Sequence, residues 1–493
     1  MQIAFRVDCS SKIGSGHLVR CLNLGRQLNK NFKKIFFLVK KSDYFEINQK
    51  FILQNKFKPI IFGKDDKTFS LKSDITSTLK ICKKKKIDTL IVDNYQIDHN
   101  WENRVKKKIK KLIVIDDLAN RKHNCDILID QNYVKNLSTR YNNLTNKNCL
   151  KLLGPKYTLL NNSFNNLKFS PDHKVKRIFI FFSTVFKSNL YNLVTSVLSK
   201  KEFKNFKIDY VVGNISKKKI IKLKKKLPTN FRLFSKQKNL HRLMKKSSFA
   251  IGSGGTNTWE RINLALPSIV FCISPNQKNI CNFLDQKNII HYLGVFKKNS
   301  KSKLYLAIRN MIYHFNKKKD LALENKSLID GYGTKRINFF LNKKKFNKIS
   351  FKKISILDTD LLFMWANDTN VRQNSFSKKT ISYKEHQRWL HKKLLDKKSI
   401  LLKLMIDRLP VGQIRFDKKK NFYHLDYSID KAFRNLGLGK LIIKESIKKF
   451  IKRNNTIIAE VKKANLKSIK IFQSLNFKEI KNNSYNKSFE LNT

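Results

Sequence analysis

Short apolar runs alternate with lysine-rich amphipathic stretches along the first third of the chain. The stretches between the runs carry apolar residues at helical spacing, which is typical of helices that bury one face. Strands that alternate with helices form a parallel sheet with helices on both faces. We therefore expect an N-terminal Rossmann-like domain over residues 1–165. The apolar runs that predict its strands are residues 3–7, 35–39, 89–92, 111–115 and 127–129.

The same alternation starts again after residue 165 and closes near Gly331-Tyr332-Gly333. It predicts a second Rossmann-like domain over residues 166–342, with Leu153-Gly154-Pro155-Lys156-Tyr157 as a hinge between the two. A basic linker is expected at 343–350. The runs that predict strands in the second domain are residues 177–182, 208–212, 249–252 and 268–271.

Residues 351–493 have a different pattern. Two apolar runs, 411–416 and 424–429, are close enough to form neighbouring antiparallel strands. A loop, a long helix at 441–452 and a strand at 456–461 follow. We expect an α+β domain here, so that the whole chain is an α/β protein of two Rossmann-like domains and one smaller C-terminal domain.

Composition adds a strong positive charge to this picture. The 493 residues, 41% of them hydrophobic, suffice for several cores, and 105 Lys and Arg against 35 Asp and Glu give a formal net charge of +70. Such a charge favours a nucleic acid or another anionic partner. However, lysine, asparagine, isoleucine and phenylalanine are abundant throughout, as in the product of an AT-rich coding sequence. No nucleic-acid-binding motif accompanies the charge, so nucleic-acid binding is the less favoured interpretation.

Other classes of protein receive no support from the sequence. No run approaches the roughly 18 apolar residues of a membrane span, and the first residues predict a strand instead of a signal peptide. The seven cysteines are scattered, odd in number and without a C-x-x-C pair, which argues against disulfides and structural zinc. We expect a cytoplasmic protein with no metal site and no membrane partner.

The first candidate site follows the first predicted strand. Gly14 and Gly16 allow a phosphate to approach backbone N–H groups at the start of a helix. His17 places an imidazole that titrates near neutral pH at the same point. Carboxylates also end two predicted strands, at Asp93 and at Asp116-Asp117, where ligands bind in open α/β sheets. A plain strand-to-helix turn with helix-capping carboxylates is the alternative interpretation.

The second candidate site is a glycine-rich loop before a predicted helix. Gly254, Gly255 and Thr256 provide backbone and hydroxyl donors for a phosphate, and Thr256 is equally suited to cap the helix. Glu260, one turn further on, is suited to accept both hydroxyls of a ribose. The amides of Asn276 and Gln277 follow the next strand and point toward the same edge. The alternative is a structural turn with a surface glutamate.

On these motifs, residues 1–340 resemble the UDP-sugar hydrolases of pseudaminic acid biosynthesis, which are related to glycosyltransferases of the two-Rossmann GT-B type. The resemblance implies that UDP is removed from UDP-2,4-diacetamido-2,4,6-trideoxy-β-L-altropyranose without a metal. It further implies that His17 is the general base for the attacking water and that Asp8 binds substrate together with the two glycine motifs. The motifs that carry it are Arg6–Ser10, Ile13–His17, Arg20–Leu22, Gly252–Arg261, Leu266–Val270, Asn276-Gln277 and Asp330–Arg336.

One segment departs from this family. The second domain of similar proteins usually opens with a strand followed by Gly-Gly and an acidic residue. This chain has Ser183-Thr184-Val185-Phe186 at that place. We expect the loss of the glycines to alter the contact with the sugar or the diphosphate, and so to affect which sugar the protein uses.

The third candidate site lies in the C-terminal domain. Arg434-Asn435-Leu436-Gly437-Leu438-Gly439-Lys440 follows a predicted strand and opens a helix, as in a pyrophosphate cradle. With Asn465 downstream, this order resembles the GNAT acetyltransferases, and residues 365–372 and 382–389 resemble those acting on amino-sugar nucleotides. The resemblance implies that acetyl-CoA is held by Arg434, Asn435, Gly437, Gly439, Lys440 and Asn465.

The catalytic groups of this third site are less clear from the sequence. Glu460 is the candidate for the base that deprotonates the acceptor amine, with a surface carboxylate as the alternative. Phe472 stands where the family usually has an acid tyrosine, and Asn476 where it usually has glycine. Tyr427 and Tyr383 have no assigned role.

The favoured function is therefore a bifunctional enzyme that acetylates the 4-amino group of a UDP-amino-sugar and then hydrolyses the UDP-sugar. Its expected partners are the UDP-sugar and acetyl-CoA. A GT-B glycosyltransferase, in which His17 activates an acceptor hydroxyl, is the first alternative. A basic nucleic-acid-binding protein on an inactive enzyme scaffold is the second.

Overall fold

The computed structural model describes residues 2–10, 14–29, 32, 34–43, 45–63, 69–165, 176–213, 215–235, 240–297, 300–342 and 348–493. Ile13 of the first glycine turn and most of the predicted basic linker lie outside these ranges. The chain divides into two compact units, Met1–Asn338 and Phe339–Thr493. The first unit holds two parallel sheets and the second holds one mixed sheet.

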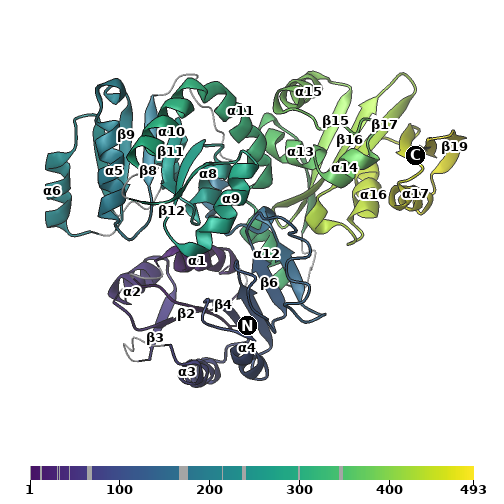
Figure 1. The fold of residues 1–493 in the computed structure, drawn as a ribbon. Helices are drawn as coiled ribbons and strands as arrows, with labels where there is room; N and C mark the ends of the chain where they lie inside the picture. Colours follow the sequence, from purple (N-terminus) through teal and green to yellow (C-terminus); the bar gives the residue numbers. More distant parts are fainter. Residues whose placement is uncertain are drawn as a thin grey trace. The chain divides into compact units, whose positions relative to one another are not determined.

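The first sheet has the strand order β3-β2-β1-β4-β5-β6-β7, and every neighbouring pair is parallel. Helices α3 and α4 contribute to the buried core on one face, whereas α1 and α2 cover the other (Figure 1). The strands are β1 Gln2–Val7, β2 Lys34–Lys40, β3 Lys58–Phe62, β4 Thr89–Asp93, β5 Lys111–Ile115, β6 Ile127–Asp130 and β7 Leu150–Leu153; the helices are α1 Gly16–Leu28, α2 Phe45–Gln54, α3 Leu71–Lys84 and α4 His99–Lys106.

The second sheet repeats this plan with the order β10-β9-β8-β11-β12-β13, again fully parallel. Helices α5 and α10 pack on one face, and α7, α8 and α9 on the other. The strands are β8 Arg177–Phe181, β9 Lys207–Val212, β10 Phe231–Ser235, β11 Phe249–Ser253, β12 Ser268–Cys272 and β13 His291–Val295; the helices are α5 Ser188–Leu198, α6 Lys217–Lys226, α7 Leu240–Lys245, α8 Asn257–Asn263, α9 Lys278–Gln286, α10 Lys301–Tyr313, α11 Phe315–Asn325 and α12 Gly333–Leu341.

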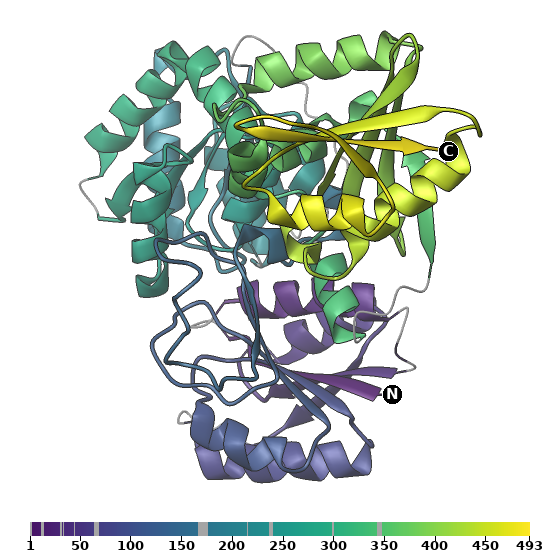
Figure 2. The ribbon, with the colours of Figure 1, turned by 90° about the vertical axis from the view of Figure 1, so that its right-hand side faces the viewer.

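The mixed sheet of the second unit has the order β14-β15-β16-β17-β18-β20-β19, and its last strands are yellow in Figure 2. All neighbouring pairs are antiparallel except β17 and β18, whose parallel pairing ends at His424 and Ile458. The strands are β14 Ile349–Lys353, β15 Ser399–Ile406, β16 Leu409–Lys418, β17 Phe422–Ile429, β18 Thr456–Lys462, β19 Lys478–Asn482 and β20 Asn486–Asn492; the helices are α13 Thr359–Ala366, α14 Thr369–Asn374, α15 Tyr383–Leu395, α16 Leu438–Phe450 and α17 Leu466–Gln473.

The predicted fold class is confirmed: two Rossmann-like parallel sheets precede an α+β domain. Helix α12 runs through the boundary between the two compact units, which falls at 338/339, a few residues before the expected end of the second domain. The expected hinge becomes a short helical turn after Gly154, whose φ of 101° favours glycine. Arg336 donates a hydrogen bond to the carbonyl of Lys156 in this segment.

A buried ion cluster supports the first sheet. Arg6 on β1 is fully buried and donates to Asp74 on α3 and to Asp8 just beyond β1. Trp101 on α4 donates its indole N–H to Asp74 over 2.9 Å. Asp74 on α3 therefore connects α3 and α4 to the central strand β1. Its carboxylate also compensates the charge of Arg6, which is buried away from water.

We predict that Asp74→Ala lowers the free energy of unfolding by about 3–5 kcal/mol, because it leaves one buried charge of a pair partly uncompensated. Urea denaturation followed by circular dichroism measures the change. Lys110→Ala is the control: its side chain is 80% exposed beside Asp88, so it should change stability by less than about 1 kcal/mol. Equal effects of the two substitutions would contradict the prediction.

Candidate active sites

His17 and Asp93 meet at the centre of the first sheet. In the strand order β2-β1-β4 the direction of the crossovers reverses between β1 and β4, which is where open α/β sheets bind ligands. His17 lies in the first turn of α1, which follows β1, and Asp93 is the last residue of β4. The two side chains are joined by His17 Nδ1 and Asp93 Oδ1, 2.6 Å apart.

Arg20 fixes the carboxylate of Asp93. It lies one helical turn after His17 on α1 and donates from Nε and Nη2 to the two oxygens of Asp93, both over 2.6 Å. Burial alone would raise the pKa of Asp93, but the charge of Arg20 and the contact with His17 outweigh it and hold that pKa well below its usual range. Asp93 is therefore a carboxylate and accepts the hydrogen bond from Nδ1–H of His17.

This hydrogen bond determines which nitrogen of His17 is available. Since Nδ1 carries the proton toward Asp93, the neutral imidazole presents Nε2 as a hydrogen-bond acceptor. Tyr95 contacts the imidazole edge-on, with ring centroids 4.6 Å apart. Its hydroxyl donates to Asp117 over 2.6 Å, and Asp117 in turn accepts from Arg20 over 2.7 Å. These contacts hold the imidazole of His17 in one orientation.

The two predicted glycines before His17 lie at a crowded turn. Gly14 has a φ of 77°, which favours glycine. At Gly16, a Cβ atom would lie 3.3 Å from the hydroxyl oxygen of Thr256 in the second sheet's glycine loop. The Oγ of Ser15 lies 2.6 Å from Oγ1 of Thr184, so the segment that departs from the family contacts the start of α1.

Asp8, a predicted substrate ligand, is held by the chain itself. Its two oxygens accept from Arg6, from the backbone N–H of Lys40 and from the side chain of Asn94. Burial would raise the pKa of Asp8, but the charge and hydrogen bonds of Arg6 lower it. Substrate binding by Asp8 stays a prediction, and its observed contacts are those of a structural carboxylate.

The second glycine loop follows β11, at the equivalent point of the second sheet, where the order β9-β8-β11 reverses. A Cβ on Gly254 would lie 2.1 Å from Sγ of Cys281, so only glycine fits. At Gly255 it would lie 3.5 Å from Nε2 of Gln277. Thr256 forms no side-chain capping bond with α8, which leaves its hydroxyl for another partner.

Glu260 lies on α8 one turn beyond this loop and accepts a hydrogen bond from the side chain of Asn257. Burial raises its pKa to about 7, because water is kept from the charged carboxylate. A ribose that donates two hydroxyls would replace that lost solvation. The predicted diol contact is thus compatible with the environment of Glu260.

Asn276 connects the two candidate sites of the first unit. Its side-chain amide donates to the hydroxyl of Tyr95 over 3.2 Å. The side-chain oxygen of Gln277 accepts from the backbone N–H of Ile273 over 3.1 Å. The structure therefore brings His17, Tyr95 and the turn after β12 together.

The C-terminal candidate site lies around the start of α16. Asn435 and Gly437 have φ angles of 62° and 76°, and Gly437 caps the helix with no side chain. This leaves the first N–H groups of α16 directed at the loop, as an anion-binding turn requires. Lys440 follows in the first turn of α16. Arg434 donates to Asp368 over 2.6 Å from Nη2 and to the carbonyl of Ile429 from Nε, whereas its Nη1 is buried without a partner.

The remaining predicted residues of this site lie on β18 and α17. Glu460 is exposed on β18, beyond the point where β17 and β18 stop pairing. Asn465 caps α17 by accepting from the N–H of Ser468. Phe472 is buried and contacts Tyr427 with ring centroids 6.0 Å apart. The hydroxyl of Tyr427 lies 3.0 Å from that of Ser468, so a phenol is present beside the position that lacks the usual tyrosine.

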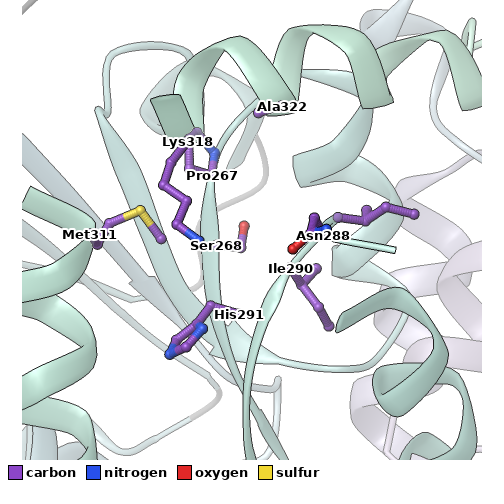
Figure 3. Close-up of a pocket in the computed structure, with 9 residues that line it drawn as sticks. Pro267, Ser268, Asn288, Ile290, His291, Met311, Lys318 and Ala322 are labelled. Atoms are coloured by element: carbon purple, nitrogen blue, oxygen red, sulfur yellow. The ribbon is translucent and has the colours of Figure 1, made fainter. Parts of the chain in front are cut away.

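A small pocket lies at the N-terminal ends of strands in the second sheet, away from the candidate sites. Figure 3 shows four of its lining residues: Ser268 and His291, which begin β12 and β13, and Met311 and Lys318, which come from α10 and α11. The glycine loop follows the other end of β11, so this pocket and the candidate ligand site lie at opposite strand ends.

The sequence indicated Asp93 and Asp117 only as carboxylates at strand ends, and it gave no individual role to Arg20 or Tyr95. The contacts that join these four residues to His17 come from the structure. In the part of the chain that the structure describes, no three His, Cys, Asp or Glu side chains are grouped to hold a metal. The described residues also include no helix with the length and apolar character needed to cross a membrane.

Comparison with known proteins finds two kinds of relative. Residues 348–478 match the acetyltransferase (GNAT) domain family. The chain is 27% identical over 291 residues to the UDP-2,4-diacetamido-2,4,6-trideoxy-beta-L-altropyranose hydrolase of Campylobacter jejuni, which covers 58% of this chain and 97% of that protein. The chain thus combines homology to this UDP-sugar hydrolase with a C-terminal GNAT domain.

Two further similar proteins were found. The uncharacterized protein MJ1062 of Methanocaldococcus jannaschii is 26% identical over 513 residues, covering 98% of this chain and 97% of that protein. The crystal structure of the Campylobacter jejuni N-acetyltransferase PseH in complex with acetyl coenzyme A is 22% identical. It covers 30% of this chain and 99% of that chain with a TM-score of 0.25.

The environment of Glu260 predicts a pH-dependent stability. Its folded-state pKa of about 7 exceeds the ordinary value of 4.5, so its contribution favours folding below pH 4.5 and is lost as the pH rises toward 7. Relative to wild type, Glu260→Gln should therefore be more stable at pH 8 than at pH 4.5, by about 3 kcal/mol at most. Urea denaturation at both pH values measures this, and a pH-independent difference would contradict it.

Proposed function

We propose that this protein hydrolyses UDP-2,4-diacetamido-2,4,6-trideoxy-β-L-altropyranose to UDP and the free sugar, and that its C-terminal domain N-acetylates the 4-amino precursor of this UDP-sugar. The observation that carries the first activity is the His17–Asp93 pair, which lies at the switch point of a sheet beside the glycine loop of a second sheet. Homology to a hydrolase acting on this UDP-sugar supports the substrate. The GNAT match supports the second activity.

In the proposed hydrolysis, Nε2 of His17 removes a proton from a water molecule as the water oxygen bonds to the anomeric carbon. The bond between that carbon and the diphosphate oxygen breaks, and its electron pair leaves with UDP. The positive charge that develops on the imidazole is stabilised by Asp93, 2.6 Å away. Arg20 and Tyr95 keep the pair in place.

UDP is proposed to lie along the second glycine loop. Backbone N–H groups at Gly254 and Gly255 and the hydroxyl of Thr256 bind the diphosphate, and the carboxylate of Glu260 accepts the ribose hydroxyls. Thr256 supports this placement, because its oxygen lies next to Gly16, one residue from His17. Asn276 and Gln277 are proposed to bind substrate from the turn after β12.

The C-terminal residues fit acetyl-CoA. Gly437 and the free N–H groups at the start of α16 suit a pyrophosphate, and β17 leaves β18 after His424, so the backbone of its last residues has no strand partner on that side. Acetyl-CoA supplies an activated acetyl group for transfer to an amine. Asn435, Gly439, Lys440 and Asn465 are proposed to hold it with Gly437. Arg434 is proposed to act from the same loop while bound to Asp368.

Glu460 is proposed as the base that accepts the proton of the acceptor amine. Its exposed position on β18, where β17 and β18 diverge, leaves it accessible to a substrate. The two activities are then consecutive: the acetylated UDP-sugar is the substrate of the hydrolysis. An uncharacterized relative aligns with almost the entire chain, so both regions also occur together in another single chain.

We predict that His17→Gln abolishes UDP release from the diacetamido UDP-sugar but leaves acetyl transfer to the 4-amino UDP-sugar intact. Glutamine keeps polarity but cannot accept the proton of the water. Phosphorus NMR measures UDP release in the absence of any sugar acceptor, and thiol release measures acetyl transfer.

The matched control is Gly437→Val, because a branched side chain is strained at a φ of 76° and lies in the proposed cradle. It should show the opposite pattern, with acetyl transfer lost and UDP release retained. Loss of both activities in either folded variant would rule out two separate sites. UDP release that requires a sugar acceptor would support a glycosyltransferase.

Asp93 is predicted to act by orienting His17. Asp93→Asn should lower kcat for UDP release by about 100- to 10,000-fold, because asparagine does not stabilise the charged imidazole. KM should change little, since Asp93 is buried behind His17 and does not face the substrate. Steady-state kinetics separates the two parameters. A rise in KM with unchanged kcat would contradict this role.

A further inference from the structure

Four arginines of the described residues are almost completely buried: Arg6, Arg20, Arg261 and Arg336 are 0%, 3%, 1% and 0% exposed. Three of them have carboxylate partners. Arg6 pairs with Asp8 and Asp74, Arg20 with Asp93 and Asp117, and Arg336 with Asp330. Arg261 has no carboxylate oxygen within ion-pair distance among the described residues.

Arg261 is surrounded by neutral acceptors. Its Nη2 donates to the carbonyl of Ser253 over 2.8 Å and to the hydroxyl of Thr258 over 3.0 Å. Its Nη1 donates to the side-chain oxygen of Asn257 over 3.2 Å, and its Nε is buried without a partner. Burial lowers its pKa to about 10, which still leaves the group charged at neutral pH.

The guanidinium lies against the last residues of β11, immediately before the second glycine loop. A Cβ on Gly252 would lie 2.4 Å from Nη1 of Arg261, so the end of the strand that leads into the loop passes against the charge. The carboxylate of Glu260, the next residue in the chain, instead accepts from Asn257, and its raised pKa of about 7 keeps it partly protonated. Among the described residues, the end of β11 therefore lies against a buried positive charge that has no ion-pair partner.

A buried charge is costly unless a counter-charge compensates it. Among the described residues, that counter-charge is present at the other three buried arginines but not beside the loop where UDP is proposed to bind. A diphosphate bound on the outer side of the loop would supply it. The field of Arg261 acts through the loop in a medium of low dielectric constant, where it is stronger than in water.

We propose that Arg261 is a positioning residue for the nucleotide diphosphate: it holds the glycine loop from behind, and its unpaired charge attracts the phosphates bound in front. This inference rests on the proposed function, namely that the loop binds UDP. The new element is that Arg261 strengthens the binding of the phosphates although its side chain does not contact them.

The test compares ligands of different charge. Isothermal titration calorimetry at pH 6 measures the binding of UDP, UMP and uridine to wild type, Arg261→Gln and Arg261→Lys. Arg261→Gln should weaken UDP by about 10-fold or more, UMP by less, and uridine hardly at all, because the lost interaction scales with ligand charge. Arg261→Lys should retain most of the UDP affinity.

A second variant neutralises the charge of Arg261 without replacing Arg261 itself. Asn257→Asp places a carboxylate where the amide oxygen now lies 3.2 Å from Nη1 and so provides the missing partner. It should weaken the binding of UDP more than the binding of uridine, because the new carboxylate occupies the charge of Arg261. This variant keeps the proposal testable if Arg261→Gln does not fold.

Arg177→Met is the matched control. Arg177 pairs with Asp209 and begins β8, at the sheet edge opposite the loop, so its loss should leave UDP affinity unchanged. Equal weakening of UDP and uridine by Arg261→Gln would show a purely structural role, and unchanged UDP affinity would refute the proposal. If wild type does not bind UDP, the proposed function fails instead.

Discussion

The hydrogen bond between His17 and Asp93 is the interaction on which the rest of the first unit depends. It exists because β1 and β4 are parallel neighbours in a register that pairs Val7 with Asp93, so the end of β4 lies beside the helix that follows β1. Arg20, one turn along that helix, then reaches both Asp93 and Asp117. The loop that begins after β5 and the turn that holds Asn276 are both connected to this centre, through Asp117 and Tyr95. A single carboxylate at a strand end thereby fixes the imidazole of His17, and Tyr95 extends this centre to the second sheet through Asn276.

The scarcity of acidic residues makes their positions informative. Only 35 Asp and Glu accompany 105 Lys and Arg, yet several carboxylates are buried as partners of buried cations or of histidine. Glu102 and Asp116, for instance, flank His123; burial would lower the pKa of His123, but the two carboxylates outweigh it and raise that pKa to about 9. The lysines contribute most of the net charge at the surface, whereas acids are retained where the fold needs them. Against this background, a buried arginine without such a partner indicates a site where the negative charge comes with a ligand.

The sequence predicts the centres of both parallel sheets well and their edges poorly. Residues 58–62, 150–153, 231–235 and 291–295 form β3, β7, β10 and β13, which are the four outermost strands, and none was predicted. Edge strands are only partly buried, so their sequences lack the continuous apolar run that marks a central strand. The candidate site follows the same logic. His17 was predictable from a local motif, but its pairing with Asp93, 76 positions away, depends on strand order. Glu460 was named from its strand alone, and the structure adds only that it is exposed.

The account combines two chemistries whose order is set by the substrate: acetylation of an amine produces the diacetamido UDP-sugar that is then hydrolysed. The most direct test of this central claim is to incubate the full chain with the 4-amino UDP-sugar and to follow UDP release by phosphorus NMR, with and without acetyl-CoA. The account predicts little UDP release from the amino sugar alone and sustained release once acetyl-CoA is added, with the diacetamido UDP-sugar as a transient intermediate. UDP release at the same rate without acetyl-CoA, or accumulation of the acetylated UDP-sugar with no UDP, would contradict it.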